Sequence, residues 1–519
     1  MLNIRPYTNK QQLLFPPSIG DYLPKNHLAC VIDEVVEQID LEPYFKKIPK
    51  VGNPSYHPAL MIKIWFYGYC VKIYSSRKIE EKLYTDIAFI YLAGMQKPDF
   101  KTISEFRRKY LNELKNTFVE ILQICHRLGM TKLSHISIDS KVMKANAGAN
   151  RTYTEKKLIE EQQILEKVIQ EYLERANQVD GEEDRKYGPD KRGNELPEDI
   201  QDKEQRIKKI KQIVEQLKQA REKLRASGKE KINLTDSDAR FQRDKSRKVL
   251  GYRVHIAVDT KQQIIVANDV STEQVDQRDL LPMIDKVIEN VEKVKQTSNN
   301  TDRNTGKGDK IKIIADSGYC SCDNLAELEG EKYKEKIDAY IPDQKYRARE
   351  RNEKNFPFDN EKFIYDESND EYVCPSGKRL YYAGKTAGRG RQGFRVYRCK
   401  DCRGCRYFGI CTTSAKGRRI KVLENQHLYK KMREKLSTVE GKKIYSLRKI
   451  TVEPAFGNLS KNLGFNEFLL RGLEKVRGEF SLMCTAHNLL KIARFIKKLG
   501  CTLIEALMIC NHKLVFDSL

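Results

Sequence analysis

The sequence has 519 residues, 39% of them hydrophobic, so it can bury a sizeable core and is long enough for roughly two to four domains. Its 96 lysines and arginines exceed its 72 aspartates and glutamates, giving a formal net charge of +24. A surplus this large favours a partner with many phosphates, because each neutralised phosphate releases counterions, although a generic basic surface is an alternative. No apolar run of about 18 residues occurs, which excludes a membrane-spanning protein, and we expect a cytoplasmic location with reduced or metal-bound cysteines.

The first predicted unit, residues 1–130, is helical. Pro58 suits the first position of a helix, since a largely apolar run follows it, and Thr102 and Glu105 have the spacing of a capping box. Several short helices follow one another, with Arg107 and two more basic residues near the end of one. This arrangement is typical of a helix-turn-helix-type DNA reader, and equally of a plain helical scaffold.

A strand and a long insertion come next. The run His135–Asp139 predicts the first strand of a sheet, within a segment spanning residues 131–152. In the polar insertion, residues 153–228, apolar residues recur at helical intervals in two stretches, which predicts an antiparallel helical hairpin. The charged, turn-rich run Gly181–Asn194 predicts its tip. We expect a solvated projecting arm, with DNA contact or dimerisation as alternative uses.

The segment 229–365 predicts the rest of a mixed sheet. Alternating apolar and polar residues from Tyr252 to Asp259 indicate a half-buried strand, and a turn joins it to a second strand. A helix, a strand ending at Asp316, another helix and a further strand follow. Without the insertion, this is the order of an RNase H-like fold. We therefore predict an α/β protein with an RNase H-like core, an N-terminal all-α domain and a helical-hairpin insertion.

Three acidic residues are placed where metal ligands would be needed. Asp139 and Asp316 each end a predicted strand, and because these strands should run parallel, both carboxylates should emerge at one end of the sheet. Asp259 closes an antiparallel strand and should lie at the opposite edge. Glu453 lies far downstream, at a predicted helix start before Pro454. Carboxylates are natural ligands for Mg²⁺, and two such ions can clamp the attacking and leaving oxygens of a phosphodiester.

A cysteine-rich insertion occupies residues 366–425. Its Cys-x-x-Cys spacing lets two thiolates reach one tetrahedral Zn²⁺, and interleaved arginines help to keep the thiolates ionised. Five candidates compete for four ligand positions, so one is spare, and the alternative is a set of reduced thiols in a basic loop. The candidates are Cys374, Cys399, Cys402, Cys405 and Cys411. We expect Cys320, Cys322 and His487 to be packing residues.

The motifs around the three acids resemble those of the DDE transposases of bacterial insertion sequences, in the branch with an N-terminal helical domain and a cysteine-rich insertion. The matching stretches are Ile138–Asn146, Ala315–Tyr319, Thr451–Gly457 and Phe468–Gly478. The resemblance covers nearly the whole chain. It implies membership of the RNase H-like, retroviral integrase superfamily, with residues 426–519 as the C-terminal helical part of the catalytic core.

The resemblance also implies a Tyr-x-x-Arg…Glu…Lys signature around the third acid. Tyr445, Arg448 and Lys461 fit it in order and are expected to contact DNA. The two gaps that flank Glu453 are each one residue longer than the related pattern, which makes Lys449 an alternative contact.

The implied activity is metal-dependent cleavage at transposon terminal inverted repeats, followed by strand transfer into target DNA. Asp139, Asp316 and Glu453 would be the catalytic residues and would hold two Mg²⁺ ions, which Mn²⁺ could replace, and Zn²⁺ would be structural. The expected partners are double-stranded DNA and a second copy of the chain, in a bacterial, nucleoid-associated location. The alternatives are a non-catalytic DNA-binding derivative and an RNase H-like nuclease, which would not require inverted repeats.

Overall fold

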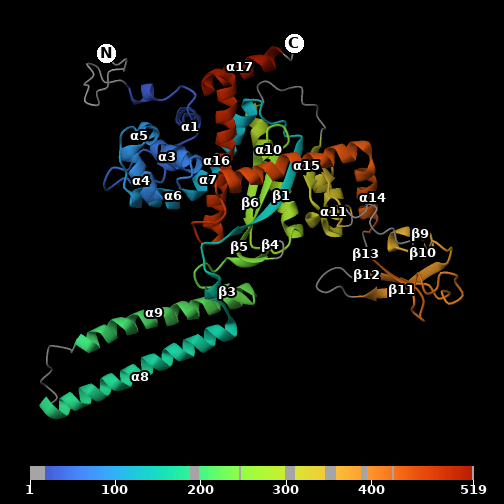
Figure 1. Ribbon diagram of the computed structural model, residues 1–519, viewed down its shortest axis with the longest axis horizontal. Helices are drawn as coiled ribbons and strands as arrows, with labels where there is room; N and C mark the ends of the chain where they lie inside the picture. Colours follow the sequence, from blue (N-terminus) through green and yellow to red (C-terminus); the bar gives the residue numbers. More distant parts are fainter. Residues whose placement is uncertain are drawn as a thin grey trace, which may run out of the picture.

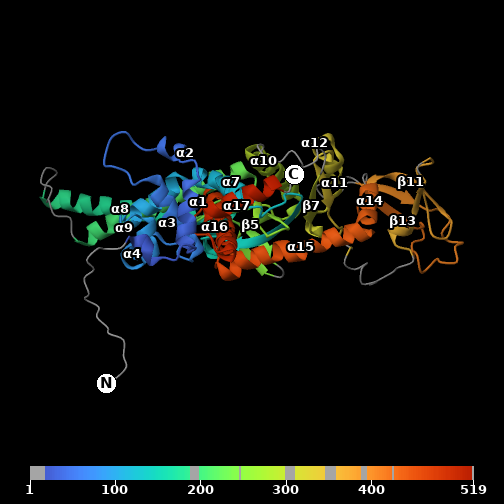
Figure 2. The ribbon, with the colours of Figure 1, turned by 90° about the horizontal axis from the view of Figure 1, so that it is seen from above.

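The computed structural model describes residues 18–187, 198–244, 247–298, 310–344, 346, 358–366, 368–386, 394–423 and 426–516. It has an N-terminal helical block, a central sheet covered by helices, a long helical arm and a small separate sheet (Figure 1). Seen from above, the arm and the small sheet lie at opposite ends of the long axis (Figure 2). Across these residues, every helix is too short or too polar to cross a lipid bilayer.

The N-terminal block packs directly on the central sheet and on a C-terminal helix. Its main helices are α1 (Leu28–Glu37), α3 (Pro58–Cys70), α4 (Ser76–Thr85), α5 (Ile87–Leu92), α6 (Phe100–Lys109) and α7 (Leu111–Arg127). Both α3 and α7 contact α16 (Leu473–Leu499), and one continuous hydrophobic core runs through the block and the central sheet. The helices of this block therefore share their buried surface with the sheet.

Two helix starts in this block were predicted from sequence. Pro58 is the first residue of α3, where its missing N–H leaves no hydrogen bond unmade, so this prediction is confirmed. The capping box at Thr102 is wrong. Asp99 Oδ1 accepts from the Thr102 amide at 2.7 Å, so α6 begins at Phe100 and Thr102 lies in its first turn.

Arg107 faces the shared core and not the solvent. Its Nη1 donates to Tyr69 Oη at 3.1 Å, and its guanidinium carbon lies 4.3 Å from the centre of the Trp65 ring. Arg107 also acts on the buried Glu479 of α16: burial raises the pKa of this carboxyl, and the positive charge of Arg107 opposes that rise. We expect Arg107→Ala to lower the free energy of unfolding by about 3 kcal/mol, because a charged hydrogen bond and a cation–π contact are lost.

Urea unfolding would measure this loss. The matched control is Arg108→Ala, since the Arg108 side chain is 69% exposed and, within the part of the chain that the structure describes, pairs with the exposed Glu105. Its unfolding free energy should stay within about 0.5 kcal/mol of the wild type. Equal stabilities for the two variants would contradict a structural role for Arg107.

The central sheet has the predicted RNase H-like order. Its strands are β1 (His135–Lys144), β4 (Arg240–Asp244), β5 (Arg247–Asp259), β6 (Ile265–Ser271), β7 (Ile311–Ala315) and β8 (Ile337–Tyr340). They lie in the order β4-β5-β1-β7-β8, with β6 also paired to β5. The β5 strand is antiparallel to β1, whereas β7 is parallel to β1 and β8 is parallel to β7. The mixed α/β fold class is confirmed.

Helices from both halves of the chain cover this sheet. They are α10 (Leu280–Ser298), α11 (Cys322–Glu329), α14 (Gln426–Ser437), α15 (Val439–Gly457) and α16. In Figure 1, α15 crosses the sheet, and it contacts β1, β5 and β7. Residues from the C-terminal part of the chain are thereby brought to the middle of the sheet.

The first strand is longer than predicted. Its pairing with β5 continues to Lys144, opposite Gly251, so β1 does not end at Asp139. The parallel partner β7 ends earlier, with Ala315 opposite Ile138. Asp139 therefore lies in the middle of a strand, one position beyond the end of its neighbour.

The insertion forms the predicted helical hairpin. It consists of α8 (Glu155–Tyr187) and α9 (Glu198–Ser227), which project from the body as an arm (Figure 1). At its base, β2 (Thr152–Thr154) pairs with β3 (Lys231–Asn233). Leu158, Leu217 and Leu224 are buried between the helices. The predicted tip, Gly181–Asn194, belongs to α8 as far as Tyr187, and its remainder lies outside the described residues.

The cysteine-rich insertion forms a second, smaller sheet. Its strands are β9 (Ile364–Asp366), β10 (Glu371–Val373), β11 (Arg379–Thr386), β12 (Phe394–Arg398) and β13 (Arg419–Leu423). They lie in the order β13-β12-β11-β10-β9. This sheet has its own hydrophobic core, formed around Leu380, Tyr397 and Ile420.

Candidate active site

Adjacent parallel strands place two of the predicted acids side by side. Ile138 of β1 is in register with Ala315 of β7, and the residue that follows each of them in the sequence is an aspartate. Asp316 caps a 3₁₀ turn, and its Oδ1 accepts from the Gly318 amide at 2.6 Å. A Cβ on Gly318 would lie 2.9 Å from that same oxygen, so glycine permits this close packing.

The third acid comes from α15. A helix start at Glu453 is wrong, because α15 runs from Val439 to Gly457 with Pro454 inside it. A proline cannot donate to the carbonyl four residues earlier, which here belongs to Ile450. That carbonyl instead accepts from Gln263 Nε2 at 2.8 Å. Gln263, in the turn between β5 and β6, thus supplies the hydrogen bond that the Ile450 carbonyl lacks within the helix. The same contact holds α15 against the sheet beside the site.

Arg448 joins the three carboxylates. Its Nη2 lies 2.7 Å from Asp139 Oδ2 and 3.7 Å from Asp316 Oδ2. Its Nη1 lies 3.8 Å from Glu453 Oε1. The Arg448 side chain is only 8% exposed, whereas that of Glu453 is 56% exposed. Acids from three distant segments therefore converge on one cationic group.

The electrostatics of this cluster follow from burial and from its charges. Burial raises the pKa of Asp139 to about 6, although Arg448 acts in the opposite direction, and Asp316 raises it further. Burial alone would lower the pKa of Arg448, but the acids, Asp139 foremost, raise it above its usual value. The guanidinium therefore stays charged and balances part of the negative charge.

A hydrogen-bonded group beside Asp139 was not found from the sequence. Ser140 Oγ donates to Asp276 Oδ1 at 2.5 Å, and Arg253 Nη1 donates to the same oxygen at 2.8 Å. Asp276 also faces the second acid loop, since a Cβ on Gly318 would lie 3.1 Å from its Oδ2. The only sequence signal was that Asp276 follows a strand of the sheet, a position shared with many loop acids.

A second group of polar side chains in mutual contact lies behind the site, centred on a histidine of β5. His255 is fully buried on β5, opposite Ser140 of β1. Its Nδ1 lies 3.0 Å from Tyr319 Oη and its Nε2 lies 3.1 Å from Asp279 Oδ2. Tyr319 ends the motif that contains Asp316. These contacts give the tyrosine of that motif a structural role behind the acids.

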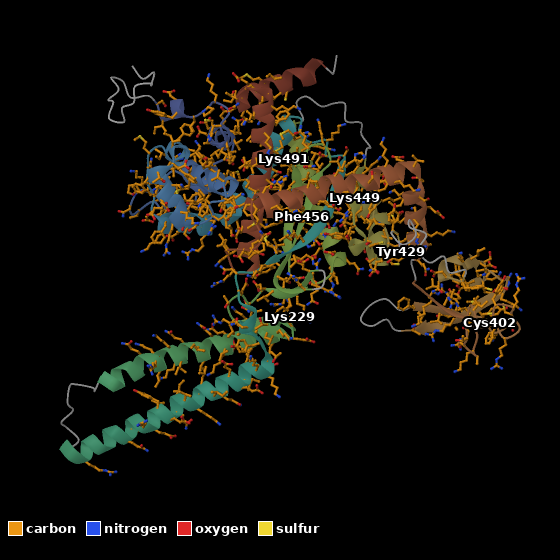
Figure 3. All side chains as sticks on the ribbon, in the orientation of Figure 1. Lys229, Cys402, Tyr429, Lys449, Phe456 and Lys491 are labelled. Carbon is orange, nitrogen blue, oxygen red and sulfur yellow. The ribbon has the colours of Figure 1, made fainter. Side chains whose placement is uncertain are left out.

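The other residues expected to contact DNA lie around the same helix. The Tyr445 ring packs edge-on against Tyr346, with ring centres 5.3 Å apart. Lys461 lies in a π-helical turn, Asn458–Asn462, directly after α15. Figure 3 shows Lys449 on α15 over the central sheet. The DNA-contact roles of these residues stay predictions.

The five predicted zinc ligands line one small cavity of about 20 Å³ in the cysteine-rich sheet: Cys374, Cys399, Cys402, Cys405 and Cys411. The Lys378 amide donates to Cys374 Sγ and the Arg418 amide donates to Cys402 Sγ, both at 3.2 Å. Such amide donors stabilise a thiolate. Figure 3 shows Cys402 far from α15, so these thiols form a centre distinct from the acids.

The donor sets fit two kinds of metal ion. Oxygen ligands at the acids suit Mg²⁺, and sulfur ligands at the cysteine cavity suit Zn²⁺. As the described side chains are arranged, no three of the histidines, cysteines, aspartates or glutamates are close enough together to hold an ion. Binding of a metal ion at the acids or at the cysteine cavity would therefore require the side chains to move closer together. The cysteines that were predicted to pack, Cys320 and Cys322, are buried, and His487 is buried with both ring nitrogens hydrogen-bonded.

Comparison with protein families identifies two segments. Residues 17–109 match a family described as Transposase domain (DUF772), and residues 373–493 match one described as Transposase DDE domain. The second segment includes Glu453, Arg448 and the five cysteines. No curated protein and no solved structure matches the chain. Together with the RNase H-like strand order, the two family matches support a DDE transposase of the insertion-sequence type.

Proposed function

We propose that this transposase cuts DNA at the terminal inverted repeats of an insertion sequence and joins the freed 3′ ends to target DNA. The observation that carries the proposal is the convergence of Asp139, Asp316 and Glu453 on the guanidinium of Arg448, with each acid within 4.0 Å of it. Carboxylates collected from three distant segments around one cation are what a divalent metal site needs.

The acids would hold Mg²⁺ ions, which Mn²⁺ could replace. Bound there, the ions would stabilise negative charge on the phosphoryl oxygens during hydrolysis and transesterification. The chain's own residues fix the ligand positions. Asp139 and Asp316 are set by strand register, and Glu453 is set by the contact of Gln263 with α15.

Arg448 is proposed to act as a counter-ion that gives way when metal binds. We expect Arg448→Gln to lower the free energy of unfolding of the metal-free protein by about 3 kcal/mol, because buried Asp139 loses its charged partner. The melting temperature of the metal-free variant should fall accordingly. Added Mg²⁺ should then raise the melting temperature of the variant more than that of the wild type. Thermal melts with and without Mg²⁺ would measure both effects.

Lys449→Gln is the matched control for that experiment. It removes one positive charge from the neighbouring position on α15, and Lys449 is exposed. Its melts should resemble those of the wild type. An Arg448→Gln protein with an unchanged response to Mg²⁺ would contradict the counter-ion role.

We further propose that DNA approaches along α15 and the π-helical turn. Lys461 carries a positive charge there, and it lowers the pKa of the half-buried Lys141 on β1 after the larger effect of burial. Paired lysines beside the acids suit a phosphate backbone. Tyr445, Lys461 and a homodimer in the active complex remain parts of this proposal.

We also propose that four of the five clustered cysteines bind one structural Zn²⁺. The support is their common cavity and the backbone amides that donate to Cys374 and Cys402. Because the sheet has a core of its own, the ion would stabilise a unit separate from the active site.

The direct test uses purified full-length protein and linear DNA that ends in the inverted repeats flanking its own reading frame. We expect Mg²⁺-dependent cuts at those ends and joined products when target DNA is added. No cutting with Mg²⁺ or Mn²⁺ would favour a non-catalytic DNA-binding derivative. Equal cutting of RNA–DNA hybrids or junctions without inverted repeats would favour a nuclease.

A further inference from the structure

One face of the cysteine-rich sheet carries a row of basic residues. Tyr381 of β11 lies opposite Arg398 of β12, and Arg398 lies opposite Arg419 of β13. Direct partners in antiparallel strands share a face, and Lys421 follows Arg419 at the next position on that side. We call Tyr381, Arg398, Arg419 and Lys421 the basic face.

The two arginines of the basic face are placed unfavourably for the protein alone. Like charges directly opposite each other in neighbouring strands are destabilising. Within the described part of the chain, neither Arg398 nor Arg419 has a carboxylate within 4.0 Å, and the buried Nε of Arg398 has no hydrogen-bond acceptor. A pair of like charges with an unused buried donor is suited to binding an anion.

The acidic residues of the same sheet do not neutralise Arg398 or Arg419, because they pair with other arginines. Arg379 lies 2.8 Å from Glu371, and Arg395 lies 2.5 Å from Asp370. From Cys374 to Leu423 the sequence has fourteen lysines and arginines and a single acid, Asp401. The basic face therefore lies within a segment that has a large uncompensated positive charge.

We propose that the basic face binds the phosphate backbone of duplex DNA, outside the point of cleavage. Guanidinium groups match phosphate oxygens with two parallel donors, which would relieve the repulsion between Arg398 and Arg419. The sheet stands at the far end of α14, away from the acids on the central sheet (Figure 1), so it would contact DNA that flanks the cut. The identity of the polyanion rests on the proposed function, in which DNA is the substrate.

Salt titration of the double variant Arg398→Gln/Arg419→Gln tests the proposal. With full-length protein and random-sequence duplex DNA, the slope of log affinity against log salt should become shallower by about two, since two phosphate contacts are lost. Affinity at about 0.1 M salt should fall on the order of 10- to 100-fold. The control Lys400→Gln/Lys416→Gln removes the same charge from exposed loop positions of the same insertion and should change the slope by less than one.

The melting temperature separates a binding role from a structural one. Removing a like-charge pair should leave the melting temperature of the double variant unchanged or raise it. A lower melting temperature, or equal loss of DNA binding in the control, would overturn the proposal. So would unchanged DNA affinity together with lost binding to RNA duplex or to vesicles of anionic lipid.

Cleavage distinguishes this inference from the proposed function. At saturating DNA, the double variant should still cut inverted-repeat ends at the wild-type rate, because the basic face is remote from the acids. If the wild type cuts nothing while the double variant still shows the shallower slope, the proposed function fails and the binding surface stands.

Discussion

We expect each of three single variants to lower the rate of end cleavage by about 10³-fold or more, with little change in affinity for DNA. They are Asp139→Asn, Asp316→Asn and Glu453→Gln. The three carboxylates surround one cationic position, so the loss of any one of these charges would remove several kcal/mol of the transition-state stabilisation that a bound metal would supply. Amide substitutions keep the shape of each side chain and so spare the fold. Single-turnover cleavage of inverted-repeat DNA with Mg²⁺ measures the effect.

Glu440→Gln is the matched control for the acid variants. Glu440 lies on the same helix as Glu453, but its side chain is 70% exposed, and among the described residues its ion pair is with Lys312. Its cleavage rate should equal that of the wild type. Any acid whose amide variant retains most of the Mg²⁺-dependent cleavage does not belong to the site.

Removal of zinc is expected to unfold the cysteine-rich sheet. Its hydrophobic core is small, and structural zinc in small domains contributes on the order of 10 kcal/mol to folding. Purified protein should contain about one zinc per chain, and a chelator should abolish the unfolding transition of this sheet in calorimetry. The transition of the central sheet should remain, because its core is separate.

Single Cys→Ser variants then identify the spare thiol. Substitution of any of four members of the cluster should release zinc, and substitution of the fifth should not. Cys322→Ser is the control, because that buried cysteine begins α11, outside the cavity. Zinc-free protein with a melting curve that a chelator does not alter would contradict the zinc site.

The sequence predicted those features that depend on short-range pattern. The order of strands and helices indicated the RNase H-like fold, and the parallel relation of two strands placed Asp139 beside Asp316. The hairpin and the buried His487 followed from apolar periodicity and from an apolar surrounding run. Each of these inferences needed only the residues within one element or the rules of strand connection.

The features that the sequence did not reveal depend on tertiary contacts. Pro454 argued for a helix start at Glu453, and only the contact of Gln263 with the Ile450 carbonyl explains why the helix continues. The central place of Arg448 and the contact of Ser140 with Asp276 join segments that are far apart in the chain. A single sequence has no local signal for such contacts.

The short ladder between β2 and β3 at the base of the arm also governs how the sheet assembles. Lys144 and Gly251 pair although they are 107 positions apart (251 − 144), a high contact order that slows folding. When the arm pairs first, its contact between Thr152 and Asn233 leaves about 26 positions to close, 8 before the arm (152 − 144) and 18 after it (251 − 233). Shortening the loop between Lys144 and Gly251 from 107 positions to about 26 halves it twice, which lowers the entropic cost of closing it by about 1.2 kcal/mol. The length of the arm can therefore change during evolution with little effect on the folding rate of the sheet that carries the acids.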